Sequence, residues 1–296
     1  MLVSLVVTGL LAASDAPREY DAFLENTAQR ALTDGLRPEA LALLARSHVT
    51  AIEPRRGVPT MLWAERFPGA RTLREQGLSP SQAARQHLLR YAAVYRLRPE
   101  SIGRLVVSEV HDLGRGAVVV GFARSHEGVP LLRDELDVVM TERYELIAFT
   151  GSLATEQAPR GEFRLNAQSA LAVAAQRLSG AISSSDAFRA SELREGGWTL
   201  HEAGGGFASA PRARRVYFDE GNTLLPAWHL EVEQGSPLRE RERGLRALVI
   251  SAVDGRLLSL VDLEANAAHT YRVWADPVAP FRPLDSPVGD AALPHP

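Results

Sequence analysis

The chain has 296 residues, of which 45% are hydrophobic and 23% charged, a balance typical of folded globular proteins with one large domain or two ordinary ones. A net charge of −3 argues against a general nucleic-acid-binding protein, which is usually basic. The sequence has no cysteine and no lysine, which excludes disulfides, thiolate metal sites, cysteine nucleophiles, phosphate-loop lysines and Schiff-base lysines.

The N-terminus has the pattern of an export signal. Residues 2–11 form an apolar run that is too short to cross a bilayer, and small residues follow at positions 12–14. No arginine precedes the run, which departs from the usual signal and leaves a buried strand as the alternative. We expect residues 1–14 to be a signal peptide, and the mature chain to be secreted or periplasmic with no membrane association after cleavage.

Residues 15–78 form an N-terminal segment with local signals for helices and one hairpin. Helical patterns cover residues 20–32 and 38–47. An alternating stretch then turns at residues 54–57, which predicts a β-hairpin.

A helix followed by strands begins at Ser79. Ser79, Pro80 and Gln82 form a capping box with proline at the first helical position, and apolar residues recur at helical spacing after it. Val-rich runs at residues 104–110 and 116–125 predict two strands, and residues 127–153 predict a hairpin.

The same order of elements returns after residue 164. Asn166 can cap a second amphipathic helix, strand-like runs follow, and Asp254-Gly255 is a strong hairpin signal. Two copies of a helix followed by several strands predict an α+β protein. We expect two helix-on-antiparallel-sheet units of cystatin-like type in tandem.

No motif for catalysis or metal binding stands out. His126-Glu127 and His201-Glu202 both lack the second histidine that a zinc-binding helix needs one turn later. No Gly-x-Ser-x-Gly turn is present either. The sequence therefore predicts no catalytic, cofactor-binding or metal-binding residues and no cofactor, so the chain is not expected to be an enzyme. An unrecognised hydrolase built on scattered carboxylates is the remaining enzymatic alternative.

The other polar clusters have structural explanations. His229 alternates out of a strand beside Trp228. The charged residues at positions 133–135 and 137 are interpreted as a solvated strand face, and the alternating charges of residues 237–245 as a loop or hairpin tip.

The hairpin region resembles the fungalysin/thermolysin propeptide (FTP) domain. The residues that carry the resemblance are the Val strand over 118–122, the Gly-Val-Pro turn at 128–130 and Thr150-Gly151. Leu131-Leu132-Arg133 and Glu142-Arg143 depart from the family pattern, which has Phe-Gly-Gly and Asp-Gly there. We assign residues 79–155 to an FTP-like domain.

Residues 164–266 are similar to a PepSY domain, which commonly follows the FTP domain in protease proregions. Residues 224–233 and 249–263 carry this similarity. Residues 267–296 resemble the start of a catalytic chain, and their prolines predict an extended tail outside any packed domain.

The resemblance implies the proregion of a fungalysin-type zinc metallopeptidase, which inhibits the protease and templates its folding, here without the catalytic domain. The implied partner is a metalloprotease catalytic domain, in cis or in trans, and no nucleic acid. A stand-alone secreted module that inhibits or binds a protease is the alternative.

Overall fold

The computed structural model describes residues 19–25, 30–65, 72–154, 158–180, 183–221, 223–235 and 244–264. The predictions for the signal peptide (1–14) and for the tail (267–296) concern residues outside these ranges, and so does most of the charged stretch 237–245. Within the described ranges, none of the helices has the length and apolar character that a membrane crossing requires.

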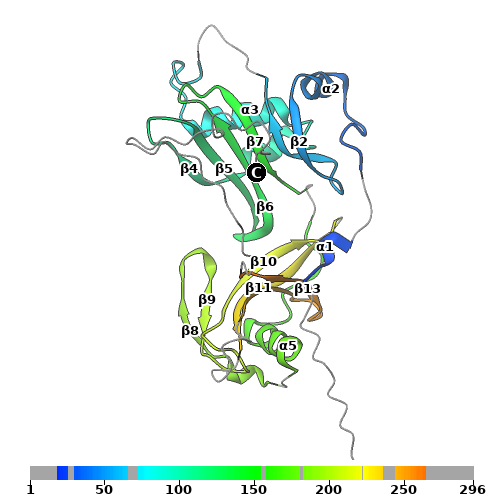
Figure 1. Cartoon of the computed structure of the whole chain (residues 1–296), viewed down its shortest axis with the longest axis vertical. Helices are drawn as coiled ribbons and strands as arrows, with labels where there is room; N and C mark the ends of the chain where they lie inside the picture. Colours follow the sequence, from blue (N-terminus) through cyan, green and yellow to red (C-terminus); the bar gives the residue numbers. More distant parts are fainter. Residues whose placement is uncertain are drawn as a thin grey trace, which may run out of the picture. The chain divides into compact units, whose positions relative to one another are not determined.

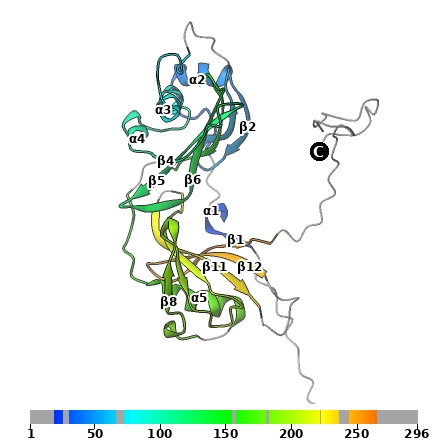
Figure 2. The same cartoon turned by 90° about the vertical axis from the view of Figure 1, so that its left-hand side faces the viewer.

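The first sheet is antiparallel throughout and has three helices on one face (Figures 1 and 2). In spatial order its strands are β2 (His48–Glu53), β3 (Val58–Trp63), β7 (Leu146–Ser152), β6 (Val129–Met140), β5 (Val118–His126) and β4 (Val106–His111). The helices are α2 (Pro38–Ala45), α3 (Pro80–Tyr91) and α4 (Pro99–Gly103). The hairpin predicted to turn at residues 54–57 is confirmed as β2–β3, and it extends this sheet.

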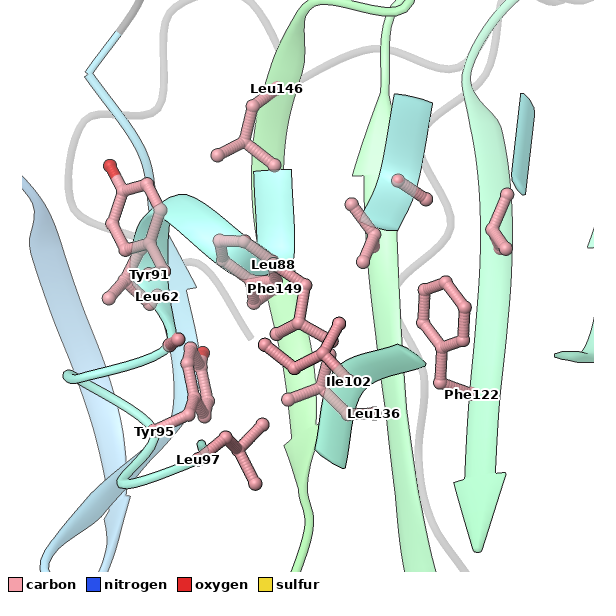
Figure 3. Packing of buried hydrophobic residues seen from close by; sticks show 14 of the residues in the cluster. Leu62, Leu88, Tyr91, Tyr95, Leu97, Ile102, Phe122, Leu136, Leu146 and Phe149 are labelled. Atoms are coloured by element: carbon pink, nitrogen blue, oxygen red, sulfur yellow. The ribbon is translucent and has the colours of Figure 1, made fainter. Parts of the chain in front are cut away.

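Helix α3 begins where the capping box predicts. Ser79 Oγ accepts the N–H of Gln82, and the Gln82 side chain accepts the N–H of Ser79 at 2.8 Å. Tyr91 in the last turn and Tyr95 just beyond it lie with ring centroids 5.1 and 5.3 Å from that of Phe149 on β7 (Figure 3). The helix is therefore fixed at its start by hydrogen bonds and along its length by burial of aromatic surface.

We expect Ser79→Ala to lower the free energy of unfolding by about 1 kcal/mol, because the mutation leaves an N–H group of the first helical turn without its acceptor. Guanidinium unfolding measures the change. Ser81→Ala, two residues further on and outside the capping box, is the control and should stay within about 0.5 kcal/mol of the parent.

The second sheet repeats the arrangement with one helix, α5 (Ala167–Ser179), on one face. Its strands in order are β1 (Tyr20–Asp21), β13 (Leu257–Asp262), β12 (Gly244–Ser251), β11 (Leu224–Gln234), β10 (Arg212–Asp219), β9 (Thr199–His201) and β8 (Ala190–Leu193). Two short 3₁₀ turns, η1 (Ser185–Ala187) and η2 (Glu195–Gly197), complete it. Asn166 Oδ1 accepts the N–H of Ser169 at 2.8 Å, which confirms the predicted cap.

The helix predicted over residues 20–32 is found only in part, and residues 26–29 lie outside the described ranges. Strand β1 occupies its start, and α1 (Ala22–Glu25) is the one helical turn described there. The physical reason is tertiary: Tyr20 pairs with Leu260 and Asp21 with Ser259, so the beginning of the chain forms an edge strand beside its last strand. Helical periodicity in a short segment is too weak to outweigh such a pairing.

The first strand of the predicted hairpin, close to the β5–β6 turn, connects the two sheets. Leu131 of β6 pairs in parallel with Tyr217 of β10, and both side chains are buried together with Leu224. The class is α+β with a helix on each antiparallel sheet, as expected. The β8–β9 hairpin, in contrast, is not among the predicted strands.

Candidate functional site

The two His-Glu pairs have structural roles. His126 and Glu127 lie at the tip of the β5–β6 hairpin, where the His126 ring meets that of Tyr217 edge-on with centroids 5.4 Å apart. His201 is buried, and its Nδ1 lies 3.0 Å from the carbonyl oxygen of Phe188. Across the described residues, no three His, Cys, Asp or Glu side chains gather closely enough to hold a metal ion.

Asp134 is not part of a solvated strand face, which corrects the sequence interpretation. It is 1% exposed, and its two carboxylate oxygens accept hydrogen bonds from Arg124 at 2.7 and 2.8 Å. The N–H of Ala154 donates to the same carboxylate. Asp134 therefore ties β5 to the segment that leaves the first sheet.

A β-bulge explains why the alternation of buried and exposed side chains along β6 does not hold at Asp134. The β5–β6 register moves from Ala123↔Glu135 to Ser125↔Pro130. Between these two pairs β5 advances by two residues, whereas β6 accommodates five. Within the bulge Arg133 has a φ of 56°, in the left-handed region. The extra residues turn Asp134 to the buried side of the strand.

Arg133 uses the same bulge to reach the second sheet. Its side chain pairs with Asp21 of β1 and donates to Ser259 Oγ of β13 at 3.3 Å. Two of the charged residues that were interpreted as solvated therefore have structural roles. Asp134 forms a buried ion pair within the first sheet, and Arg133 links the two sheets.

A second ionic link is buried. Arg56, in the β2–β3 turn, lies 2.7 Å from the carboxylate of Asp219 at the end of β10, and both side chains are buried. Arg56 also donates to Ser152 Oγ at 3.1 Å. An ion pair out of water holds its partners in one geometry, so this contact fixes the hairpin against the second sheet.

The helix-free face of the first sheet carries a row with apolar residues at its centre and an exposed histidine at each end. Cross-strand pairing places these residues in one line across all six strands: His48, Trp63, Ala148, Val139, Val119 and His111. The helices pack on the opposite face, where Leu62, Val138 and Phe149 are buried. Trp63 is 44% exposed, whereas Ala148 beside it is 1% exposed, so Trp63 is the apolar side chain through which this row, hereafter the Trp63 row, can contact a partner.

His229 alternates away from Trp228 as expected, but it is enclosed rather than solvated. Its ring lies 5.1 Å from the ring of Trp198, and it pairs across the ladder with Arg214. Burial lowers the pKa of His229 to about 4, and the charges of Arg214 and of two further arginines push it in the same direction.

We expect acid to destabilise the protein through His229. The unfolded chain takes up a proton on this histidine near pH 6.5, whereas the folded protein does so only near pH 4. The free energy of unfolding should therefore fall by on the order of 2 kcal/mol as the pH drops through this window.

Guanidinium unfolding of the parent and of His229→Gln between pH 7 and 4 measures the effect. The free energy of unfolding should fall less steeply with decreasing pH in the variant than in the parent. His87, whose pKa is also lowered by burial, is present in both proteins. Parallel curves for the two proteins would contradict the assignment to His229.

A pocket of 490 Å³ opens where α4 meets the β5–β6 hairpin. We call it the arginine pocket, and its polar lining includes Arg98, Ser101, Arg104, Arg124, His126 and Glu127. Sequence reasoning missed it because these residues come from segments some twenty positions apart, with no motif joining them. The only signal was the density of arginine on both sides of α4.

Comparison with known proteins does not assign a family. No family model matches the chain, and no curated protein matches it in sequence. Among solved structures, the chain is similar to the Bacillus megaterium YpeB C-terminal domain. The match has 13% sequence identity and a TM-score of 0.28, and it covers 70% of this chain and 72% of that one.

Proposed function

We propose that this chain is a propeptide-like module of a secreted zinc metalloprotease, which inhibits the catalytic domain and templates its folding. The sequence resemblance to an FTP domain over residues 79–155 and to a PepSY domain over residues 164–266 supports the proposal. Each of these ranges contains a helix packed on an antiparallel sheet.

The observation that carries the proposal is the Trp63 row on a rigid support. The first sheet is fastened to the second by the Arg56–Asp219 pair, by Arg133 and by the pairing of Leu131 with Tyr217. A surface held in this way can bind a partner without first losing conformational freedom. The role assigned to the hairpin is therefore that of scaffold, and its two strands also contribute Val139 and Ala148 to the docking surface.

Direct binding tests the proposal. The chain would be titrated against a thermolysin-type catalytic domain whose general-base glutamate is replaced by glutamine, so that the enzyme cannot digest the chain. We expect a saturable 1:1 complex that Trp63→Ser weakens, because the mutation removes an exposed aromatic anchor.

Leu193→Ser is the matched control, since Leu193 is an exposed apolar residue (75%) on β8 of the second sheet. It should leave binding unchanged. Equal losses for the two variants would show that the Trp63 row is not the docking surface, and no complex with the folded parent would contradict the proposal itself.

A further inference from the structure

One edge of β10 has a gap in its strand pairing at Arg215. On this edge β9 pairs with β10 as far as Ala213, and β6 pairs with it at Tyr217. If the two registers continued, Gly197 and Val129 would both lie opposite Arg215. Within the described chain neither residue pairs with it, and a pocket of 440 Å³ lined by all three opens there instead.

The backbone of Arg215 directs its N–H and C=O groups into this gap. The N–H of His201 on β9 donates to the C=O of Pro211 at 2.9 Å, so the polar groups of residue 211 face β9. Successive residues of a strand direct these groups to opposite edges, so residues 213 and 215 face the same way as residue 211. Arg215 therefore offers one donor and one acceptor at an open edge.

Two local features of the sequence keep the neighbouring strands out of the gap. Gly196 and Gly197 have φ angles of 71° and 75°, in the left-handed region, so the chain leaves the line of β9 there. On the other side, a continued parallel ladder would need the N–H of residue 130 to donate to the C=O of Arg215. Residue 130 is a proline, which has no N–H, so β6 cannot close the gap.

The side chain of Arg215 lines the same pocket. Its guanidinium lies 5.0 Å from the ring centroid of Phe163 and 5.7 Å from that of Trp228. It forms no ion pair with any described residue, including Glu127, which precedes the lining residue Gly128. The rings contact the guanidinium through cation–π interactions, which leave its N–H groups able to donate to a ligand.

We propose that this gap, hereafter the Arg215 gap, binds a short acidic segment of a partner polypeptide in extended conformation. One residue of the segment exchanges two backbone hydrogen bonds with Arg215, as paired residues of antiparallel strands do. The side chain of that residue then lies on the same face of the sheet as the side chain of Arg215. An aspartate or glutamate at this position places its carboxylate against the guanidinium. This inference does not rest on the proteolytic role, and its test contains no protease.

Amide hydrogen exchange of the free chain tests the open edge. The amide of Arg215 should exchange at least about tenfold faster than the amides of Arg214 and Val216, which face the paired strand β11. If all three amides were equally protected, the edge would be closed and the proposal would be overturned.

The probe for binding is the peptide acetyl-Ser-Val-Glu-Val-Ser-amide, titrated calorimetrically into the full chain. The comparison peptides have glutamine in place of glutamate, one with a C-terminal amide and one with a free C-terminal carboxylate. We expect the glutamate peptide to bind at least about fivefold more tightly than either, because it alone places a carboxylate opposite Arg215. The bound peptide should also slow exchange of the Arg215 amide.

Two variants separate the Arg215 gap from general charge. Arg215→Gln, shown to be folded by circular dichroism, should remove the preference for glutamate over glutamine. Arg177→Gln, in the last turn of α5, should keep it. Three results with the folded proteins would overturn the proposal: no binding of the glutamate peptide to the parent, equal or tighter binding of either glutamine peptide, or a preference that survives Arg215→Gln.

Discussion

Replacing Asp134 by asparagine should lower the free energy of unfolding by about 3 kcal/mol, because it leaves the guanidinium of Arg124 largely buried without its counter-charge. The substitution keeps the size of the side chain, so the loss reports charge and hydrogen bonding rather than a cavity. Guanidinium unfolding at pH 7 measures it.

Glu135→Gln is the matched control, since Glu135 is the next residue on β6 and is exposed. It should change stability by less than about 0.5 kcal/mol. The double variant Arg124→Gln/Asp134→Asn should cost clearly less than the sum of its single variants, because the second mutation removes the uncompensated charge. Strict additivity would mean that the two residues do not act as a pair.

Replacing Arg56 by alanine should lower the free energy of unfolding by about 3 kcal/mol for a related reason, since it leaves the carboxylate of Asp219 buried without its partner. The pair joins residues 163 positions apart in the sequence and links the two sheets, so its loss should also reduce the cooperativity of unfolding. Guanidinium transitions followed by tryptophan fluorescence and by circular dichroism should coincide in the parent and separate in the variant.

Arg46→Ala supplies the control, because Arg46 forms an exposed ion pair with Glu65 at 3.9 Å. An exposed pair of this kind contributes about 0.5 kcal/mol or less. If Arg56→Ala cost no more than Arg46→Ala, the buried pair would not be what fastens the two sheets together.

Local signals in the sequence predicted those elements that local interactions define. Ser79 with Gln82, Asn166, and the Asp254-Gly255 turn each act within four residues, and each is found in the predicted place. The alternating runs likewise identified most strands, since one face of each sheet is buried beneath a helix.

Features that depend on distant pairing could not be predicted in this way. Strand β1 forms because Tyr20 pairs with Leu260, 240 residues later, and no local sequence pattern predicts that pairing. Asp134 is buried by a bulge that shifts the alternation, so its position in the run of charges was misleading. The arginine pocket and the Trp63 row are likewise assembled from separate segments, and they become visible only when the strands are aligned.

Inhibition of a metalloprotease is the most direct test of the proposed function. The folded chain would be titrated into an active thermolysin-type enzyme, with the initial rate of cleavage of a short chromogenic peptide as the readout. We expect saturable inhibition at or below micromolar chain, weakened by Trp63→Ser and unaffected by Leu193→Ser. Full protease activity at micromolar concentrations of chain shown to be folded and intact would contradict it.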